Sequence, residues 1–138
     1  MKYQDNIKQV AALQPDYLGF IFYKKSARNF DIESIPEIPK SIKKTSVFVD
    51  ADIDFVIKKI ELHELKAIQL HGKETPEYCK QLSKQGIEII KVFSIKDEFN
   101  FDILESYEDV CDYYLFDTKG KLPGGNGYTF DWSVLNNY

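Results

Sequence analysis

An aspartate followed by a glycine-rich loop is the feature of this 138-residue chain best suited to chemistry. Asp117 directly follows the apolar run Tyr-Tyr-Leu-Phe, and the sequence GGNG stands at residues 124–127. A carboxyl group that is partly removed from water can donate a proton near neutral pH. The sequence therefore predicts Asp117 as a general acid. An aspartate that caps the loop or pairs with Lys119 is the structural alternative.

The GGNG loop supplies backbone that can adopt a positive φ and approach a ligand closely. It does not match the phosphate-binding pattern GxxxxGK. It does not match GxGxxG either, because Phe130 stands where the third glycine would be. A mobile loop over an active site fits better, with Gly125 and Gly127 as candidate substrate-binding positions. A plain surface turn remains the alternative.

Two further polar side chains follow strand-like segments and are candidates for the same site. Arg28 lies in the loop YKKSARNF, and its guanidinium can form a bidentate pair with a substrate carboxylate. A solvated surface charge is the other interpretation of a lone arginine. His71 follows an apolar segment and could either orient a neighbouring group or bind backbone atoms.

Metal and thiol chemistry have little support. Cys79 and Cys111 form no CxxC pair, and we expect both to be buried as small hydrophobic residues. His63 begins an HE pair like that of zinc proteases, but Ala67 stands where the second histidine would be. Since His71 is the only other histidine, the sequence predicts no metal site.

Strand-like and helical segments alternate along the chain and must position these side chains. The strand-like segments are mostly continuous apolar runs, which are typical of strands buried on both faces of a parallel sheet. They cover residues 17–22, 46–49, 67–70, 88–93 and 113–116. Helices are expected over residues 6–13 with Asp5 as N-cap, after Asp52, from Thr75-Pro76 to a stop before Gly86, over 102–107, and from Asp131 onward. Residues 32–44 contain Pro36 and Pro39, so any helix there is short or broken.

This alternation predicts parallel strands joined by right-handed crossovers. An open doubly wound sheet and a barrel both satisfy the pattern, and both bind ligands at the carboxyl ends of their strands. Arg28, His71 and Asp117 all follow predicted strands. An eightfold barrel needs at least about 200 residues. Five strands therefore make either an open sheet or an incomplete barrel.

The composition excludes several partner classes. The chain is 43% hydrophobic and 29% charged with a net charge of −4, and it has no basic stripe for nucleic acid. No apolar run approaches the roughly 20 residues that span a membrane. The segment MKYQDNIKQV lacks the apolar centre of a secretory signal. We therefore expect a cytoplasmic protein with neither nucleic acid nor membrane as partner.

Five motifs follow one another along the chain, and they are DYLGFIF at 16–22, SAR at 26–28, QLHG at 69–72, FDT at 116–118 and GGNGYTFDW at 124–132. In this order they resemble the phosphoribosylanthranilate isomerase family. The likeness spans essentially the whole chain, and the run from DT to TFDW is its most specific part. It implies a (β/α)₈ barrel enzyme of tryptophan biosynthesis that uses neither metal nor organic cofactor.

The resemblance also implies a reaction and roles. Enzymes of this family convert N-(5-phosphoribosyl)anthranilate into a 1-deoxyribulose 5-phosphate by an Amadori rearrangement. The family's acid, which protonates the furanose ring oxygen and opens the ring to a Schiff base, corresponds to Asp117. The arginine that holds the anthranilate carboxylate corresponds to Arg28. A general base then removes the C2 proton, and the resulting enolamine tautomerises to the ketone.

Against the family layout, this chain departs at both ends. It begins in the helix after the first strand and stops before the seventh, so residues 1–138 are expected to form a single incomplete barrel domain with family strands two to six. The family's base is a cysteine at the end of the first strand, a position that neither Cys79 nor Cys111 matches. Its phosphate site follows strands seven and eight. We expect little activity from the chain alone, and two open sheet edges that invite self-association. The alternatives are an inactive remnant that associates with another chain, and a small open-sheet ligand-binding protein.

Overall fold

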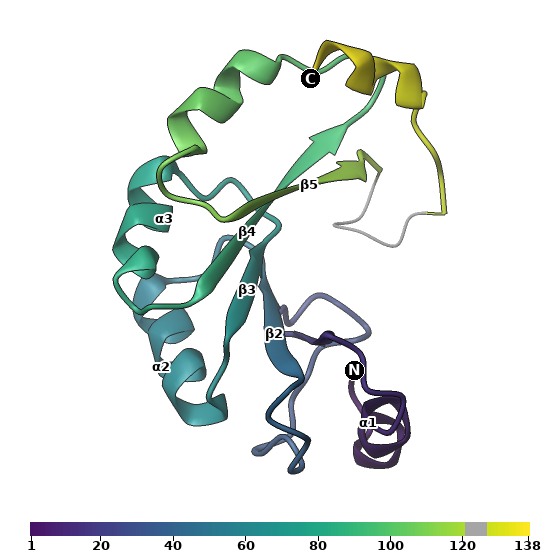
Figure 1. Cartoon of the computed structure of the whole chain (residues 1–138), viewed down its shortest axis with the longest axis vertical. Coiled ribbons are helices and arrows are strands. Elements are labelled where there is room, and N and C mark those ends of the chain that lie inside the picture. The colour runs from purple at the N-terminus through teal and green to yellow at the C-terminus, as the bar shows by residue number, and fades with distance from the viewer. Residues whose placement is uncertain (121–126) are drawn as a thin grey trace.

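The computed structural model describes residues 1–120 and 127–138, and its five strands pair in parallel in the order β1-β2-β3-β4-β5 (Figure 1). Every neighbouring pair in the sheet is also consecutive in the chain, which is the βα repeat that the sequence predicts. The strands are β1 (Tyr17–Ile21), β2 (Lys43–Phe48), β3 (Ala67–Leu70), β4 (Glu88–Ile95) and β5 (Tyr113–Thr118).

Helices occupy the connections β2–β3, β3–β4 and β4–β5, whereas residues 22–42 between β1 and β2 form no helix. The α-helices are α1 (Gln4–Ala11), α2 (Ile53–His63) and α3 (Pro76–Ser83), and the 3₁₀ helices are η1 (Phe101–Tyr107) and η2 (Trp132–Asn137). Of these, α1 precedes β1 and η2 follows β5. The predicted start of α3 is confirmed, because Pro76 is its first residue and the Thr75 hydroxyl accepts the backbone N–H of Tyr78 at 3.2 Å. Asp52 is the N-cap of α2 as expected, and Gly86 adopts a φ of +66° beyond the end of α3.

Several predicted boundaries are wrong. Tyr3 rather than Asp5 is the N-cap of α1, and the two C-terminal helices are 3₁₀ rather than α. β2 begins at Lys43, inside the segment considered for a short helix, because the polar run KKTS pairs with β1. β5 extends to Thr118, because Ser94 and Ile95 of the longer β4 pair with Asp117 and Thr118.

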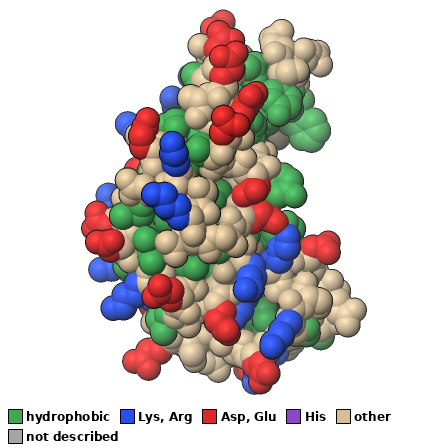
Figure 2. Space-filling view, turned by 60° about the vertical axis from the view of Figure 1, so that its left-hand side comes forward, with side chains coloured by type: hydrophobic (Ala, Val, Ile, Leu, Met, Phe, Trp, Pro, Cys, Tyr) green, Lys and Arg blue, Asp and Glu red, His purple; other side chains and the backbone are tan. Residues whose placement is uncertain are grey.

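All three α-helices cover the same face of the sheet. Ile7 of α1, Val56 of α2 and Leu82 of α3 are buried in one hydrophobic cluster with Phe20 of β1 and Ile68 of β3. An open doubly wound sheet carries helices on both faces, whereas a barrel carries them on its outside alone. Because the α-helices lie on one face only, the layer order favours the barrel interpretation. The outer surface of the helices mixes acidic and basic side chains (Figure 2).

The opposite face of the sheet is concave. Near the start of the strands, the Tyr17 hydroxyl of β1 donates to Glu88 of β4 at 2.6 Å, and the Lys43 ammonium of β2 pairs with the same carboxylate. In a flat sheet β1 and β4 would lie about 14 Å apart. Ala67 of β3 lies opposite Glu88 in the register, and its small side chain leaves room for this contact. The sheet is therefore curved like part of a barrel wall.

His63, the last residue of α2, is buried against the hydrophobic cluster, and its protonation makes the stability of the fold depend on pH. Its side chain is buried and stacks on Phe22, with ring centroids 5.4 Å apart. Its Nε2 has no hydrogen-bond partner among the described residues. Burial lowers the pKa of His63 below the ordinary value of 6.5, and the nearby Lys59 and Lys44 lower it further. The folded chain therefore holds this imidazole neutral.

We expect the substitution His63→Phe to weaken the acid sensitivity of the fold. Below pH 6.5 the unfolded chain binds a proton at His63 that the folded chain resists, so stability falls as the pH falls. Phenylalanine keeps the stacking on Phe22 and cannot titrate. Urea unfolding at about pH 7 and pH 5 measures the change. Between these two pH values the free energy of unfolding should fall less in His63→Phe than in the unmodified chain. In Leu62→Phe, which changes an exposed neighbour in α2, it should fall as much as in the unmodified chain. Equal losses in all three proteins would refute this role of His63.

Candidate active site

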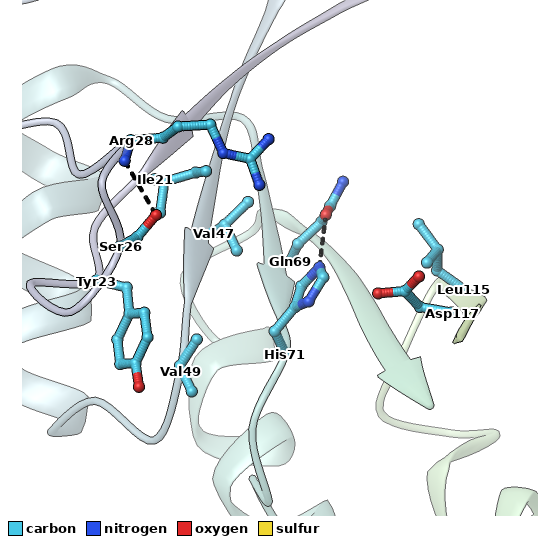
Figure 3. Close-up of a pocket in the computed structure, with 10 residues that line it drawn as sticks. All are labelled: Ile21, Tyr23, Ser26, Arg28, Val47, Val49, Gln69, His71, Leu115 and Asp117. Atoms are coloured by element: carbon cyan, nitrogen blue, oxygen red, sulfur yellow. Dashed lines mark hydrogen bonds between the residues drawn. The ribbon is translucent and has the colours of Figure 1, made fainter. Parts of the chain in front are cut away.

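The carboxyl ends of the strands surround a pocket of about 320 Å³ on the concave face (Figure 3). Its walls are apolar, and its polar side chains come from elements that are far apart in the sequence. The apolar residues are Ile21, Val47, Val49 and Leu115, and the polar residues are Tyr23, Ser26, Arg28, Gln69, His71 and Asp117. The three polar side chains that the sequence predicts after separate strands, Arg28, His71 and Asp117, thus line a single pocket.

Asp117 reaches this pocket from within β5. The sequence prediction places it just after the strand, but its pairing with Ser94 makes it a strand residue with a set direction. Its Oδ1 accepts the backbone N–H of Thr118 at 2.8 Å, and its carboxylate points toward His71 (Figure 3). In the described residues no ion pair joins it to Lys119. The half-buried carboxyl group is therefore available to a ligand.

His71 follows β3, and its ring lies next to Gln69 and faces the Asp117 carboxylate (Figure 3). Its backbone N–H donates to the Phe48 carbonyl at 2.9 Å, and its Nε2 lies 3.2 Å from Gln69 Oε1. Burial lowers the pKa of His71, while the negative charges of Asp117 and Glu74 oppose that effect. The imidazole is thus neutral near neutral pH, and it can hydrogen-bond to a ligand without adding charge.

Arg28 enters the pocket from the loop after β1. Phe30 anchors this loop in the hydrophobic core, and the backbone N–H of Phe30 donates to the Ile21 carbonyl at 2.6 Å. The Arg28 backbone N–H donates to Ser26 Oγ at 3.1 Å. Its guanidinium extends across the mouth of the pocket (Figure 3), where it can bind an anionic group.

The glycine loop is described only in part. Gly125 lies outside the described residues, so its predicted contact with substrate stays a prediction. Gly127 has a φ of +72°, which agrees with the predicted need for left-handed backbone, but it is not among the residues that line the pocket. Its predicted role in substrate binding likewise stays a prediction.

Two charged residues near the pocket were not predicted as functional. Lys91 and Glu74 are buried on the helix-covered side of the strand ends, where their side chains pair at 3.2 Å. A lysine inside the apolar run EIIKVF was the available signal, because a buried lysine requires a partner. The sequence could not indicate which of the 22 acidic residues supplies it.

The described residues show neither a metal cluster nor a membrane-spanning helix. Within residues 1–120 and 127–138, no group of three or more His, Cys, Asp or Glu side chains is placed to hold a metal ion. In the same residues no helix is long and apolar enough to cross a membrane. Cys79 is buried as predicted, and Cys111 is half-buried.

Comparison with known proteins gives one consistent family. A family model described as N-(5′phosphoribosyl)anthranilate (PRA) isomerase matches residues 1–138. The chain is 40% identical to the N-(5′-phosphoribosyl)anthranilate isomerase of Phocaeicola vulgatus and 41% identical to that of Parabacteroides distasonis. Both matches cover the whole of this chain, and they cover 67% and 65% of the relatives. The chain thus spans about two thirds of the length of these relatives.

Solved structures agree with this family. The isomerase of Thermotoga maritima superposes with a TM-score of 0.78 at 27% identity, over all of this chain and 68% of that one. The isomerase of Thermus thermophilus superposes with a TM-score of 0.83 at 23% identity, over 99% of this chain and 66% of that one, which supports the fold alone. A further isomerase (TM-score 0.63, 22% identity, 84% of this chain, 71% of that one) was solved with reduced 1-(o-carboxyphenylamino)-1-deoxyribulose 5-phosphate.

We expect Gly72→Ala to disturb the rim of the pocket. A Cβ at Gly72 would lie 2.3 Å from Asp50 Oδ1 and 2.7 Å from the Asp50 backbone nitrogen, so the backbone must shift. Overpacking of this kind costs about 1–3 kcal/mol. Gly19→Ala is the matched control, because a Cβ there meets no described atom within 4 Å. Urea unfolding should show a clear loss for Gly72→Ala and little change for Gly19→Ala, and equal stability of the two variants would contradict the close approach.

Proposed function

This chain belongs to the N-(5′-phosphoribosyl)anthranilate isomerase family, and from that premise we propose that its pocket binds N-(5′-phosphoribosyl)anthranilate and supports its isomerisation in the cytoplasm. The convergence of Arg28 and Asp117 carries this proposal. Arg28 follows β1 and Asp117 belongs to β5, which are the two edge strands of the sheet, and yet both residues line one pocket.

Arg28 is proposed to bind the carboxylate of the substrate. A guanidinium forms two parallel hydrogen bonds with a carboxylate, which sets the orientation of the aromatic ring as well as its position. The apolar side chains of Ile21 and Val47 line the same wall and offer a surface for that ring. Asp117 lies on the other side of the pocket from Arg28 (Figure 3), and the sugar of a substrate held in this way is proposed to extend toward it.

Asp117 is proposed to act as the general acid. Its carboxyl group donates a proton to the furanose ring oxygen, the bond between that oxygen and C1 breaks, and the nitrogen lone pair forms the Schiff base. Loss of the C2 proton to a base then gives the enolamine, which tautomerises to the ketone. The neutral His71 beside Asp117 is proposed to hydrogen-bond to the opened sugar. Asp117 supplies the proton that opens the ring, and the C2 proton leaves to the base, a role that the family gives to a cysteine position that neither Cys79 nor Cys111 matches. Oxidation at C2 is balanced by reduction at C1 of the same substrate, so no redox partner is needed.

We expect Asp117→Asn to lower the rate of isomerisation without unfolding the chain. The amide keeps an oxygen for the Thr118 N–H but cannot donate the acidic proton, and a general acid contributes about 10²–10⁴-fold to a rate. The purified chain is assayed with substrate under single-turnover conditions. Asp97→Asn is the matched control, because Asp97 is a highly exposed aspartate outside the pocket. Where Asp97→Asn turns the substrate over measurably, the same rate in Asp117→Asn would remove Asp117 from the acid role.

The two sheet edges are proposed to make the chain self-associate. Among the described strands, β1 and β5 each pair on one side only, and no residue of β5 is fully buried. Tyr113 of β5 is 55% exposed. An unpaired parallel edge with apolar side chains is a template for a strand of another chain.

Light scattering during size-exclusion chromatography tests this association. We expect species heavier than 16.1 kDa that increase with protein concentration. Tyr113→Lys should reduce them, because a charge on an edge strand opposes strand addition. Leu62→Lys replaces an equally exposed residue on α2 and should leave them unchanged. A monomer at all concentrations, or an equal effect of both variants, would contradict association through β5.

A further inference from the structure

A buried ion pair lies directly behind the pocket wall. Lys91 is in the middle of β4, and the Lys91 and Glu74 side chains are only 3% and 1% exposed. Neighbouring residues of a strand face opposite sides of the sheet. Asp117 and its register partner Ser94 face the pocket side, so Lys91, three residues from Ser94, faces the helices.

The Lys91 ammonium binds the backbone on both sides of His71. Its Nζ donates to the carbonyl oxygens of Leu70 at 3.2 Å and Gly72 at 2.8 Å, which are the residues immediately before and after the histidine. A third carbonyl, that of Val92 in β4, lies 3.2 Å from the same nitrogen. The turn that carries His71 is therefore attached to β4 through a single side chain.

The Glu74 carboxylate completes this attachment. Its Oε2 accepts from Lys91, and its Oε1 accepts the backbone N–H groups of Gly72 at 3.2 Å and Asp50 at 2.9 Å. Asp50 follows the pocket residue Val49, and its Oδ1 accepts the Lys73 N–H at 2.6 Å. One ion pair thus joins the carboxyl ends of β2 and β3 to the middle of β4.

Stability alone does not account for such a pair. Removing two charges from water is expensive, and apolar replacements of buried pairs are often neutral or stabilising. A buried pair with full hydrogen bonding can instead select one arrangement of the groups around it. Here those groups are the peptide units that flank His71.

We propose that Lys91 and Glu74 are positioning residues that hold the His71 imidazole in the pocket, in contact with Gln69 and facing Asp117. They touch no position where substrate is proposed to lie, and they act through the backbone of residues 70–72. The catalytic meaning of this arrangement rests on the proposed function. The arrangement itself can be measured without substrate.

The measurement is the protonation state of the His71 ring, observed by ¹⁵N NMR. Gln69 Oε1 can only accept a hydrogen bond, so its contact with His71 requires the proton on Nε2. The unmodified chain should therefore show one Nε2–H tautomer for neutral His71. The double substitution Lys91→Met and Glu74→Gln should produce a mixture of tautomers and a changed titration midpoint. His63, the other histidine, is an internal reference and should not change.

The matched control removes the Lys43–Glu88 ion pair, which lies where β2 and β4 begin. Lys43→Met with Glu88→Gln makes the same two kinds of substitution between β2 and β4 but lies away from the pocket. It should leave the His71 tautomer and titration unchanged even where it lowers the melting temperature. A folded Lys91→Met/Glu74→Gln protein with an unchanged His71 ring would overturn the proposal.

Hydrogen exchange of the unmodified chain keeps the proposal testable if the double variant does not fold. The Gly72 N–H, which is bound to Glu74, should be protected as strongly as the His71 N–H, which is bound to β2. Exchange of the Gly72 N–H at the rate of an open loop would contradict the attachment. Both experiments are made without ligand, so failure of the proposed isomerase activity would be seen separately, in the Asp117 assay.

Discussion

Parallel pairing of consecutive strands brings all five carboxyl ends to one edge of a concave sheet, and each proposed functional side chain depends on that register. Arg28, His71 and Asp117 are far apart in the sequence and share no local motif. They meet because each follows or ends a strand whose neighbours run in the same direction. Curvature then turns their side chains toward one pocket of about 320 Å³. A flat sheet with the same register would hold Arg28 and Asp117 too far apart to bind one small substrate.

Charged residues stabilise this curved sheet at both ends and on both faces. At the start of the strands, Tyr17, Lys43 and Glu88 connect β1, β2 and β4 across the concave face. On the helix-covered face, Lys91 and Glu74 connect the carboxyl ends of β2 and β3 to the middle of β4. The first group is partly open to water and spans the curvature, whereas the second is buried and binds backbone groups next to the pocket. We therefore assign the curvature of the sheet to the first group and the positioning of His71 to the second.

The sequence was sufficient for the positions and parallel direction of the five strands and for three of the polar residues that line the pocket, because apolar runs and the residues after them are local signals. It left the strand order open between a doubly wound sheet and a barrel. The sequence was insufficient to place strand boundaries that are set by pairing with a neighbouring strand. The polar run KKTS joins β2 only because β1 and Glu88 provide partners, and Asp117 belongs to β5 only because β4 is longer than its apolar run. The partner of Lys91 depends on a turn that brings Glu74 beneath β4, and no periodicity encodes that contact.

A crystal structure of this chain with reduced 1-(o-carboxyphenylamino)-1-deoxyribulose 5-phosphate tests the proposed site most directly. We expect the carboxylate of the ligand to form a bidentate pair with the Arg28 guanidinium. We also expect the sugar chain to lie between His71 and Asp117, within hydrogen-bond distance of the Asp117 carboxyl group. A ligand bound outside this pocket, or bound in it with no contact to either Arg28 or Asp117, would contradict the assignment of this site.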